Sequence, residues 1–205
     1  MNGLDNNRVN VIGEIISGFT FNHELFGEGF YTADLAVERT SGNKDILPLM
    51  VSERLVDVHK DHTGRTVEIN GQFRSYNLHG GMKNRLVLSV FAAELQFIGK
   101  PEDGDRNEIY LDGYICKPPI YRKTPLGREI TDLLLAVNRA YGKSDYIPCI
   151  SWGRNARYAS MLQVGSRLRI WGRIQSREYI KKLSETESET RVAYEVSVSG
   201  MEEEN

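Results

Sequence analysis

Residues 9–15, Val-Asn-Val-Ile-Gly-Glu-Ile, have a counterpart one hundred positions later in residues 109–115, Ile-Tyr-Leu-Asp-Gly-Tyr-Ile. Apolar residues alternate in both stretches and a glycine stands near the end of each, which is typical of a β-strand with one buried face. Three more stretches recur in the same order, namely 36–39 with 136–139, 45–48 with 145–148 and 67–71 with 168–172. A period of about 100 residues matches the size of a domain, so the sequence predicts two copies of one domain.

Each copy predicts five strands, with a short helix between the third and the fourth. The strands of the first copy are expected around 9–15, 31–37, 46–51, 67–73 and 86–91, and those of the second around 109–115, 130–137, 147–152, 168–174 and 192–198. The helix is expected between Ser52 and Gly64 in the first copy and over 155–162 in the second. This order predicts an all-β protein of two tandem five-stranded OB-fold barrels, each with a short helix between strands 3 and 4.

The domain boundaries follow from the repeat and from one polar stretch. Residues 1–99 are expected to form the first OB domain and residues 106–200 the second. The stretch 100–105 contains proline, glycine and acidic residues, which is typical of a linker. Residues 201–205 are expected to form a short acidic tail beyond the last strand.

Composition excludes several classes of protein. The two cysteines, Cys116 and Cys149, form no CxxC motif, so we interpret both as core residues in a reducing compartment. No apolar run approaches the ~20 residues needed to span a membrane, and residues 1–10 lack a signal-peptide pattern, so we expect a cytoplasmic protein. We find neither a metal-ligand set nor a nucleophile–base set, and expect no cofactor and no catalysis. The His59/His62 pair is interpreted as a solvated helix end.

Charge is distributed unevenly between the two copies. The chain carries a formal net charge of −2. Residues 1–105 contain 10 basic and 15 acidic side chains, whereas residues 106–205 contain 16 basic and 13 acidic ones. Because phosphate neutralisation requires local positive charge, the second copy is the better candidate for nucleic-acid binding.

The predicted fourth strand of the second copy carries the strongest local signal. Its alternate positions are four arginines, two aromatic residues and one glutamine, which are expected to share one outward face: Arg167, Arg169, Trp171, Arg173, Gln175, Arg177 and Tyr179. Cations that follow the phosphates and rings that stack on bases are how single-stranded nucleic acid is held. An alternative remains open, in which the arginines pair with acids such as Glu178 or Glu195 and a neighbouring subunit covers Trp171.

The second copy resembles the bacterial single-stranded DNA-binding protein family. The matching pieces extend in order over almost one hundred residues: 109–113, 135–139, 150–156, 164–168 and 171–179. Members of that family are OB folds that bind single-stranded DNA without sequence preference in replication, recombination and repair. They use no cofactor and catalyse no reaction.

The resemblance implies a set of binding residues. The stacking aromatics fall at Tyr141, Tyr146, Trp152 and Tyr179, and the phosphate-contacting positions at Arg154, Arg177 and Lys143. The strand pattern adds Arg139, Arg169, Trp171 and Arg173. For each aromatic, packing in the core or in an interface is the alternative.

The first copy and the chain end depart from the family pattern. Ser41, Ile46 and Ser52 occupy the positions of Tyr141, Tyr146 and Trp152, so the DNA surface of the first copy is expected to be degenerate. The end lacks a hydrophobic tip, which makes recruitment of replication enzymes through a tail doubtful. Members with two OB domains commonly form homodimers with four barrels, and we expect one here. The competing hypothesis is a primosome-accessory type of protein-interaction module.

Overall fold

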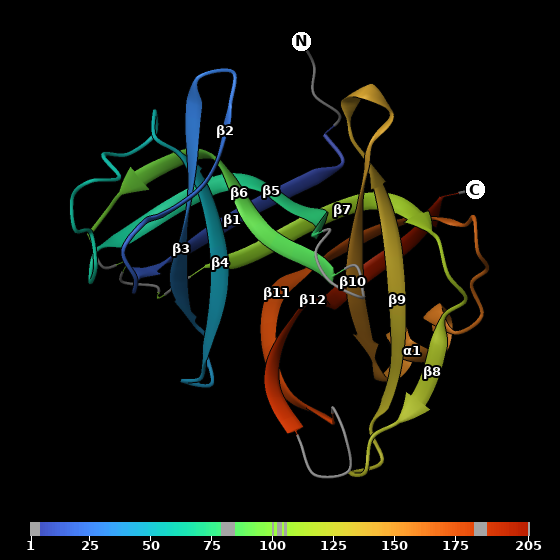
Figure 1. Cartoon of the computed structure of the whole chain (residues 1–205). Helices are drawn as coiled ribbons and strands as arrows, with labels where there is room; N and C mark the ends of the chain where they lie inside the picture. Colours follow the sequence, from blue (N-terminus) through green and yellow to red (C-terminus); the bar gives the residue numbers. More distant parts are fainter. Residues whose placement is uncertain are drawn as a thin grey trace.

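The computed structural model describes residues 5–78, 85–99, 101, 104, 106–182 and 188–204 (Figure 1). The first repeat forms β1 (Asn7–Ile15), β2 (Thr20–Leu25), β3 (Glu28–Glu38), β4 (Lys44–Ser52), β5 (Thr66–Leu78) and β6 (Arg85–Phe97). The second forms β7 (Asn107–Ile115), β8 (Ile120–Lys123), β9 (Glu129–Asn138), η1 (Ala140–Gly142), β10 (Ser144–Trp152), α1 (Gly153–Ala159), β11 (Arg167–Lys182) and β12 (Ser188–Glu204). In the described residues, no helix has the length and apolar character to cross a membrane.

The strands of each repeat pair in a closed ring. In the first repeat β1 pairs with β3 and β5, β4 pairs with β3 and β6, and β5 pairs with β6; β7, β9, β10, β11 and β12 repeat the scheme. The β4–β6 and β10–β12 pairs are the parallel ones, as in an OB fold. A Cβ on Gly113 would lie 2.7 Å from the Ala136 carbonyl oxygen, so glycine permits the close approach of β7 and β9. The predicted all-β, OB-type fold is confirmed.

The two repeats join through their first strands. β1 runs antiparallel to β7, and Val9 pairs with Ile109 at the middle of the register. The pairing therefore relates the repeats by an approximate two-fold axis and connects the described strands into one 12-stranded sheet. Asn7 bonds to both backbone groups of Phe73 at 2.8 and 2.9 Å, and Asn107 bonds in the same way to Ile174 at 2.7 and 2.8 Å.

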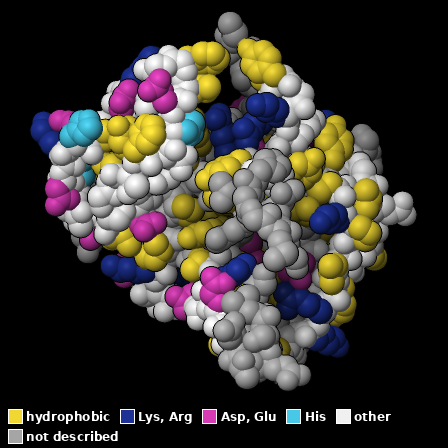
Figure 2. Space-filling view, in the orientation of Figure 1, with side chains coloured by type: hydrophobic (Ala, Val, Ile, Leu, Met, Phe, Trp, Pro, Cys, Tyr) yellow, Lys and Arg dark blue, Asp and Glu magenta, His cyan; other side chains and the backbone are white. Residues whose placement is uncertain are grey.

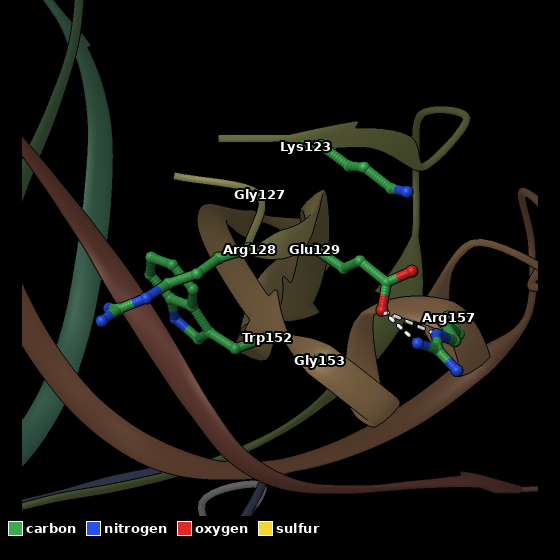
Figure 3. Close-up of a pocket in the computed structure, with 7 residues that line it drawn as sticks. All are labelled: Lys123, Gly127, Arg128, Glu129, Trp152, Gly153 and Arg157. Carbon is green, nitrogen blue, oxygen red and sulfur yellow. Dashed lines mark hydrogen bonds and ion pairs between the residues drawn. The ribbon is translucent and has the colours of Figure 1, made fainter. Parts of the chain in front are cut away.

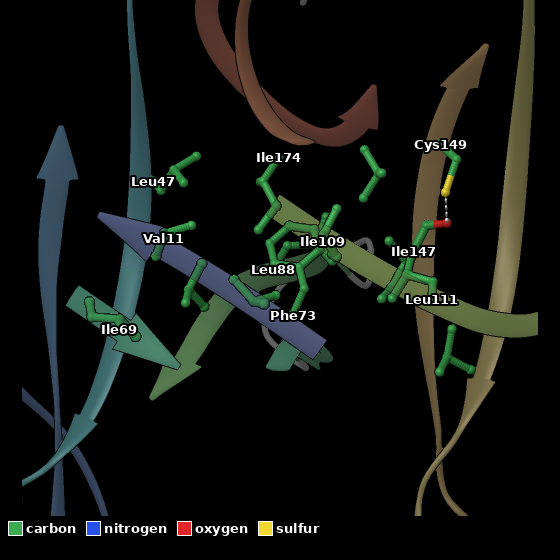
Figure 4. Packing of buried hydrophobic residues seen from close by; sticks show 14 of the residues in the cluster. Val11, Leu47, Ile69, Phe73, Leu88, Ile109, Leu111, Ile147, Cys149 and Ile174 are labelled. Carbon is green, nitrogen blue, oxygen red and sulfur yellow. Dashed lines mark hydrogen bonds between the residues drawn. The ribbon is translucent and has the colours of Figure 1, made fainter. Parts of the chain in front are cut away.

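The hydrophobic core is shared by the two repeats (Figure 4). Alternate residues of β1 and β7 point inward, and Val9, Val11, Ile109 and Leu111 are buried. The same cluster includes Phe73 at the junction. Burying such side chains stabilises the fold by about 1.5–3 kcal/mol each, so the repeats stabilise one another.

The predicted helix of the first repeat is wrong. Residues 53–65 form turns and bends, although Ser52 accepts a bond from the Arg54 N–H as a capping residue would. Asp57 and Asp61 accept bonds from backbone N–H groups two residues ahead, which offers the chain an alternative to helical bonding. The second predicted helix exists as α1, two residues earlier than expected at its start.

Three other boundaries differ from the expectation. The hairpin strands β2 and β8 were not predicted, because their short sequences lack a clear alternation. The expected acidic tail continues β12 to Glu204, where acids pair with arginines of β11. Of the expected linker 100–105, only Pro101 and Gly104 belong to the described residues.

Candidate nucleic-acid interface

Trp152 lies where β10 passes into α1 (Figure 3). Gly153 makes the turn between them with a φ of +56°, a conformation that favours glycine. The indole is 38% exposed beside a cavity of about 530 Å³ that Lys123, Arg128 and Arg157 also line. The strand end thus presents an aromatic ring among three cations.

One acid at this cavity has its own partner. Glu129 accepts a 2.7 Å bond from Arg157 and points toward it in Figure 3, while the Arg128 side chain passes the indole of Trp152. Within the described chain, Lys123 and Arg128 form no ion pair. Arg154, on the first turn of α1, is exposed. These cations are available to an anion near Trp152.

Tyr146 shares the exposed face of β10 with Trp152, because every second residue of a strand points to the same side and the two are six positions apart. The six residue steps from Tyr146 to Trp152 span about 20 Å in a strand. Tyr141, in the β9–β10 turn, is 94% exposed and has a φ of +64°. Such left-handed backbone is unfavourable for a tyrosine, and here it presents the whole ring to solvent.

Tyr179 and Arg177 extend this surface onto β11. Tyr179 is 37% exposed, and the Arg177 guanidinium lies 6.0 Å from its ring centre. Arg177 also approaches Glu195 at 3.5 Å, so the predicted alternative of pairing with this acid holds for Arg177. All four predicted stacking residues are therefore exposed on the second repeat.

The arginines of the predicted row on β11 are not free, because each one pairs with a carboxylate. Residues 167–172 pair with both β7 and β12, whereas later residues pair only with β12. On the first segment Arg169 is held by Glu204 at 2.7 Å, and Trp171 packs against Tyr110 with 5.5 Å between ring centres. Arg169 and Trp171 therefore lie beside the acidic end of β12, where carboxylates on the neighbouring strand neutralise the arginines.

Arg139 and Arg173 are half-buried and bond across the boundary between the two repeats. Arg139 pairs with the buried Asp145 and donates a 2.7 Å bond to the Ser75 carbonyl of the first repeat. Arg173 of the second repeat pairs with the buried Asp45 of the first at 3.0 Å. Desolvation by burial, and then repulsion from Arg39, lower the pKa of Arg173. The strand pattern could not show the Ser75 partner of Arg139 or the Asp45 partner of Arg173, because both come from the other repeat.

Sequence reasoning missed Lys123 and Arg128 as neighbours of Trp152. The β8–β9 hairpin brings both cations to the end of β10. Among the residues that the structure describes, no group of three or more His, Cys, Asp or Glu side chains is placed to hold a metal.

Known proteins resemble the second repeat in sequence and both repeats in fold. A model described as the Single-strand binding protein family matches residues 106–201. Single-stranded DNA-binding protein A of Bacillus subtilis is 36% identical over 80 residues, which cover 36% of this chain and 46% of that protein. Single-stranded DNA-binding protein B of the same organism is 34% identical over 80 residues, which cover 36% of this chain and 71% of that protein.

The fold comparison extends over the entire chain. The crystal structure of wild-type single-stranded DNA binding protein from Thermus aquaticus matches with a TM-score of 0.73 at 20% identity, over 100% of this chain and 95% of that one. In sequence, the chain spans about half the length of several curated relatives that it matches. Because the chain is 34% identical to protein B of Bacillus subtilis and covers 71% of that protein, the chain belongs to the single-strand binding protein family.

Proposed function

We propose that this protein binds single-stranded DNA without sequence preference, mainly through its second repeat. The bases would stack on Tyr141, Tyr146, Trp152 and Tyr179, and the phosphates would contact Arg154, Arg177 and Lys143. The observation that carries the proposal is the exposed ring of Trp152 beside Lys123, Arg128 and Arg157. Stacking tolerates any base, because every base has a π-face.

The contacts proposed here differ from the sequence prediction in four residues. Arg139, Arg169 and Arg173 are committed to carboxylates, and Trp171 packs on Tyr110, so we leave them out of the DNA surface. Lys123 and Arg128 take their place, since both border Trp152. The resulting surface follows β10 from the β9–β10 turn to α1 and continues onto β11.

We further propose two OB domains, residues 1–99 and 106–200, in a cytoplasmic homodimer. The names of the relatives support single-stranded DNA as the partner, and the proposed role of this binding is in replication, recombination or repair. A strand that crosses several binding surfaces of one assembly gains affinity from a high effective concentration. No catalytic reaction is part of this proposal.

The test is a tryptophan-fluorescence titration with oligo-dT at roughly 50 and 200 mM salt, a range over which phosphate-dominated binding weakens strongly. Of the two tryptophans, Trp152 lies on the proposed surface, so its quenching reports binding there. The informative variant is Tyr146→Ala. Its control is Tyr114→Ala, because the two tyrosines are 43% and 42% exposed in the same repeat, but Tyr114 lies beside Asp5 and Asp112.

We expect quenching that weakens as salt rises. The binding free energy derived from it should become less favourable by about 1–3 kcal/mol in Tyr146→Ala and stay unchanged in Tyr114→Ala. Equal losses in both variants would contradict the proposed surface. A folded protein with no affinity at low salt would instead favour a protein-interaction module.

A further inference from the structure

The first repeat contains a groove that sequence comparison did not reveal. Its volume is about 480 Å³, within the usual range for small-molecule sites. Its lining combines rings, cations and small polar groups: Asn22, His23, Leu25, Phe30, Met50, Arg74, Ser75, Tyr76, Ser89, Phe91, Arg139 and Lys143. We propose that this groove is a second site for single-stranded DNA, which takes a base and its phosphate; the proposal rests on the function proposed above.

The floor of the groove is an aromatic stack. His23 and Phe30 lie parallel within 9°, with 5.0 Å between ring centres, and Phe91 follows at 5.7 Å from Phe30. The Arg74 guanidinium lies over the Phe91 ring, 3.8 Å from its centre. Phe30 is buried, yet it lies outside the core cluster, so this stack belongs to the outer face of the sheet. Tyr76 adds a half-exposed ring at the rim.

The charge of the groove suits a phosphate. Arg74, Arg139 and Lys143 line it, and its lining includes no Asp or Glu. Arg139 is satisfied by Asp145, but Arg74 bonds only to the neutral Gln72 among the described residues. Desolvation, followed by repulsion from Arg139, lowers the pKa of Arg74. A partly desolvated cation without a carboxylate partner attracts an anionic ligand.

The groove adjoins the surface of the second repeat. Lys143 comes from the β9–β10 turn that also presents Tyr141, and the Tyr146 N–H donates a 2.7 Å bond to the Ser75 hydroxyl. In Figure 2, Lys and Arg side chains gather in the upper middle of the face, beside a histidine. A strand that stacks on Tyr146 would therefore reach the groove over a continuous surface, without crossing an acidic region of its lining.

The test compares two lengths of oligo-dT on the full chain. One OB fold covers roughly 4–16 nucleotides, so an oligomer of roughly 8 fits the second repeat alone and one of roughly 35 reaches both repeats. The groove variant is Arg74→Gln with Tyr76→Ala. Its matched control, Arg54→Gln with Phe21→Ala, removes one exposed cation and one exposed ring of the first repeat that do not line the groove.

We expect the groove variant to bind the short oligomer like wild type and the long one at least about fivefold more weakly. The slope of log affinity against log salt should fall by about 0.7 for one lost phosphate contact. Iodouracil-substituted oligo-dT should photo-crosslink wild type at Tyr76, His23 or Phe91, which tests the groove without a variant.

Two outcomes overturn the proposal in distinguishable ways. Unchanged affinity for the long oligomer, with crosslinks confined to the second repeat, would refute the groove and leave the proposed function in place. Failure of wild type to bind either oligomer would refute both.

Discussion

The groove of the first repeat and the equivalent surface of the second occupy the same place on the fold but use different side chains. Strand pairing makes Phe73–Val90 equivalent to Ile174–Val196, so Ser89 and Phe91 match Glu195 and Ser197. In the second repeat, Glu195 binds Gln175 and Arg177. In the first, serine and phenylalanine leave Arg74 free of a carboxylate and provide a ring.

A second exchange occurs across the β3–β4 pair. Trp152 pairs with Ile130 in the second repeat, and the equivalent pair in the first is Ser52 with Phe30. Each repeat therefore has one aromatic ring in this cross-strand pair, whose two side chains share one face of the sheet. The ring is Trp152 on β10 in the second repeat and Phe30 on β3 in the first. Position-by-position comparison registers a lost tryptophan and misses the neighbouring phenylalanine.

The largest effect should come from the carboxylates that join the repeats. Asp45→Asn and Asp145→Asn should each lower the free energy of unfolding by about 3 kcal/mol, because arginines and a backbone N–H lose a buried anion. Asp45→Asn should cost more, since it releases both Arg39 and Arg173. Urea unfolding measures both. The control is Asp132→Asn, whose exposed pair with Arg122 should be worth less than about 1 kcal/mol; an equal loss there would contradict the role of the junction.

Replacing Tyr141 should separate stability from binding. Tyr141→Gly relieves a left-handed backbone and should raise the free energy of unfolding by up to about 1 kcal/mol. It should also weaken oligo-dT binding by about 1–3 kcal/mol, because one stacking ring is lost. Thermal unfolding and fluorescence titration provide the two values. Ser41→Gly, at the matching turn, should leave affinity unchanged; a loss of affinity in that variant as large as in Tyr141→Gly would indicate that the ring itself is unimportant.

Neutralising Glu195 should make the second repeat more like the first. In Glu195→Gln, Arg177 loses its carboxylate and becomes available to a phosphate. We expect affinity for oligo-dT to rise several-fold and the salt slope to steepen by about 0.7. Glu178→Gln removes an exposed charge from β11 and should act more weakly through screened, general electrostatics. Equal changes in the two variants would assign the effect to net charge.

The smallest effect concerns the thiols, which occur only in the second repeat. Burial raises the pKa of Cys149 and, less strongly, that of the half-buried Cys116. A thiol reagent at neutral pH should therefore modify Cys116 slowly and Cys149 only when the repeat unfolds. In the Cys116→Ser variant, the rate at which the reagent modifies Cys149 can be measured at increasing urea concentrations. This rate reports the opening of the second repeat alone. Rapid labelling in native buffer would show that β10 opens locally.

Local patterns predicted most of the fold. Alternation in 9–15 and 109–115 located β1 and β7, and the repeat spacing gave the strand order. The helix predicted after Ser52 shows the limit of local patterns. Asp57 and Asp61 accept bonds from nearby backbone N–H groups, which in a helix would bond to backbone carbonyls. The exposed tyrosines of the site were predicted from the family resemblance. The partners across the repeats were not, because Ser75 lies 64 residues from Arg139 and Asp45 lies 128 residues from Arg173.

The sequence by itself determined two all-β repeats, because periodicity is a local property, and its family resemblance placed exposed rings on the second repeat. Only the tertiary structure decided which cations remain available and where the rings of the first repeat gather. Those properties depend on strand neighbours: Asp45 and Asp145 take arginines at the junction, Glu204 takes Arg169, and Phe30, Phe91 and Arg74 meet from three separate strands. Charge pairing and ring stacking act over a few ångströms in space, a distance that spacing along the chain does not encode.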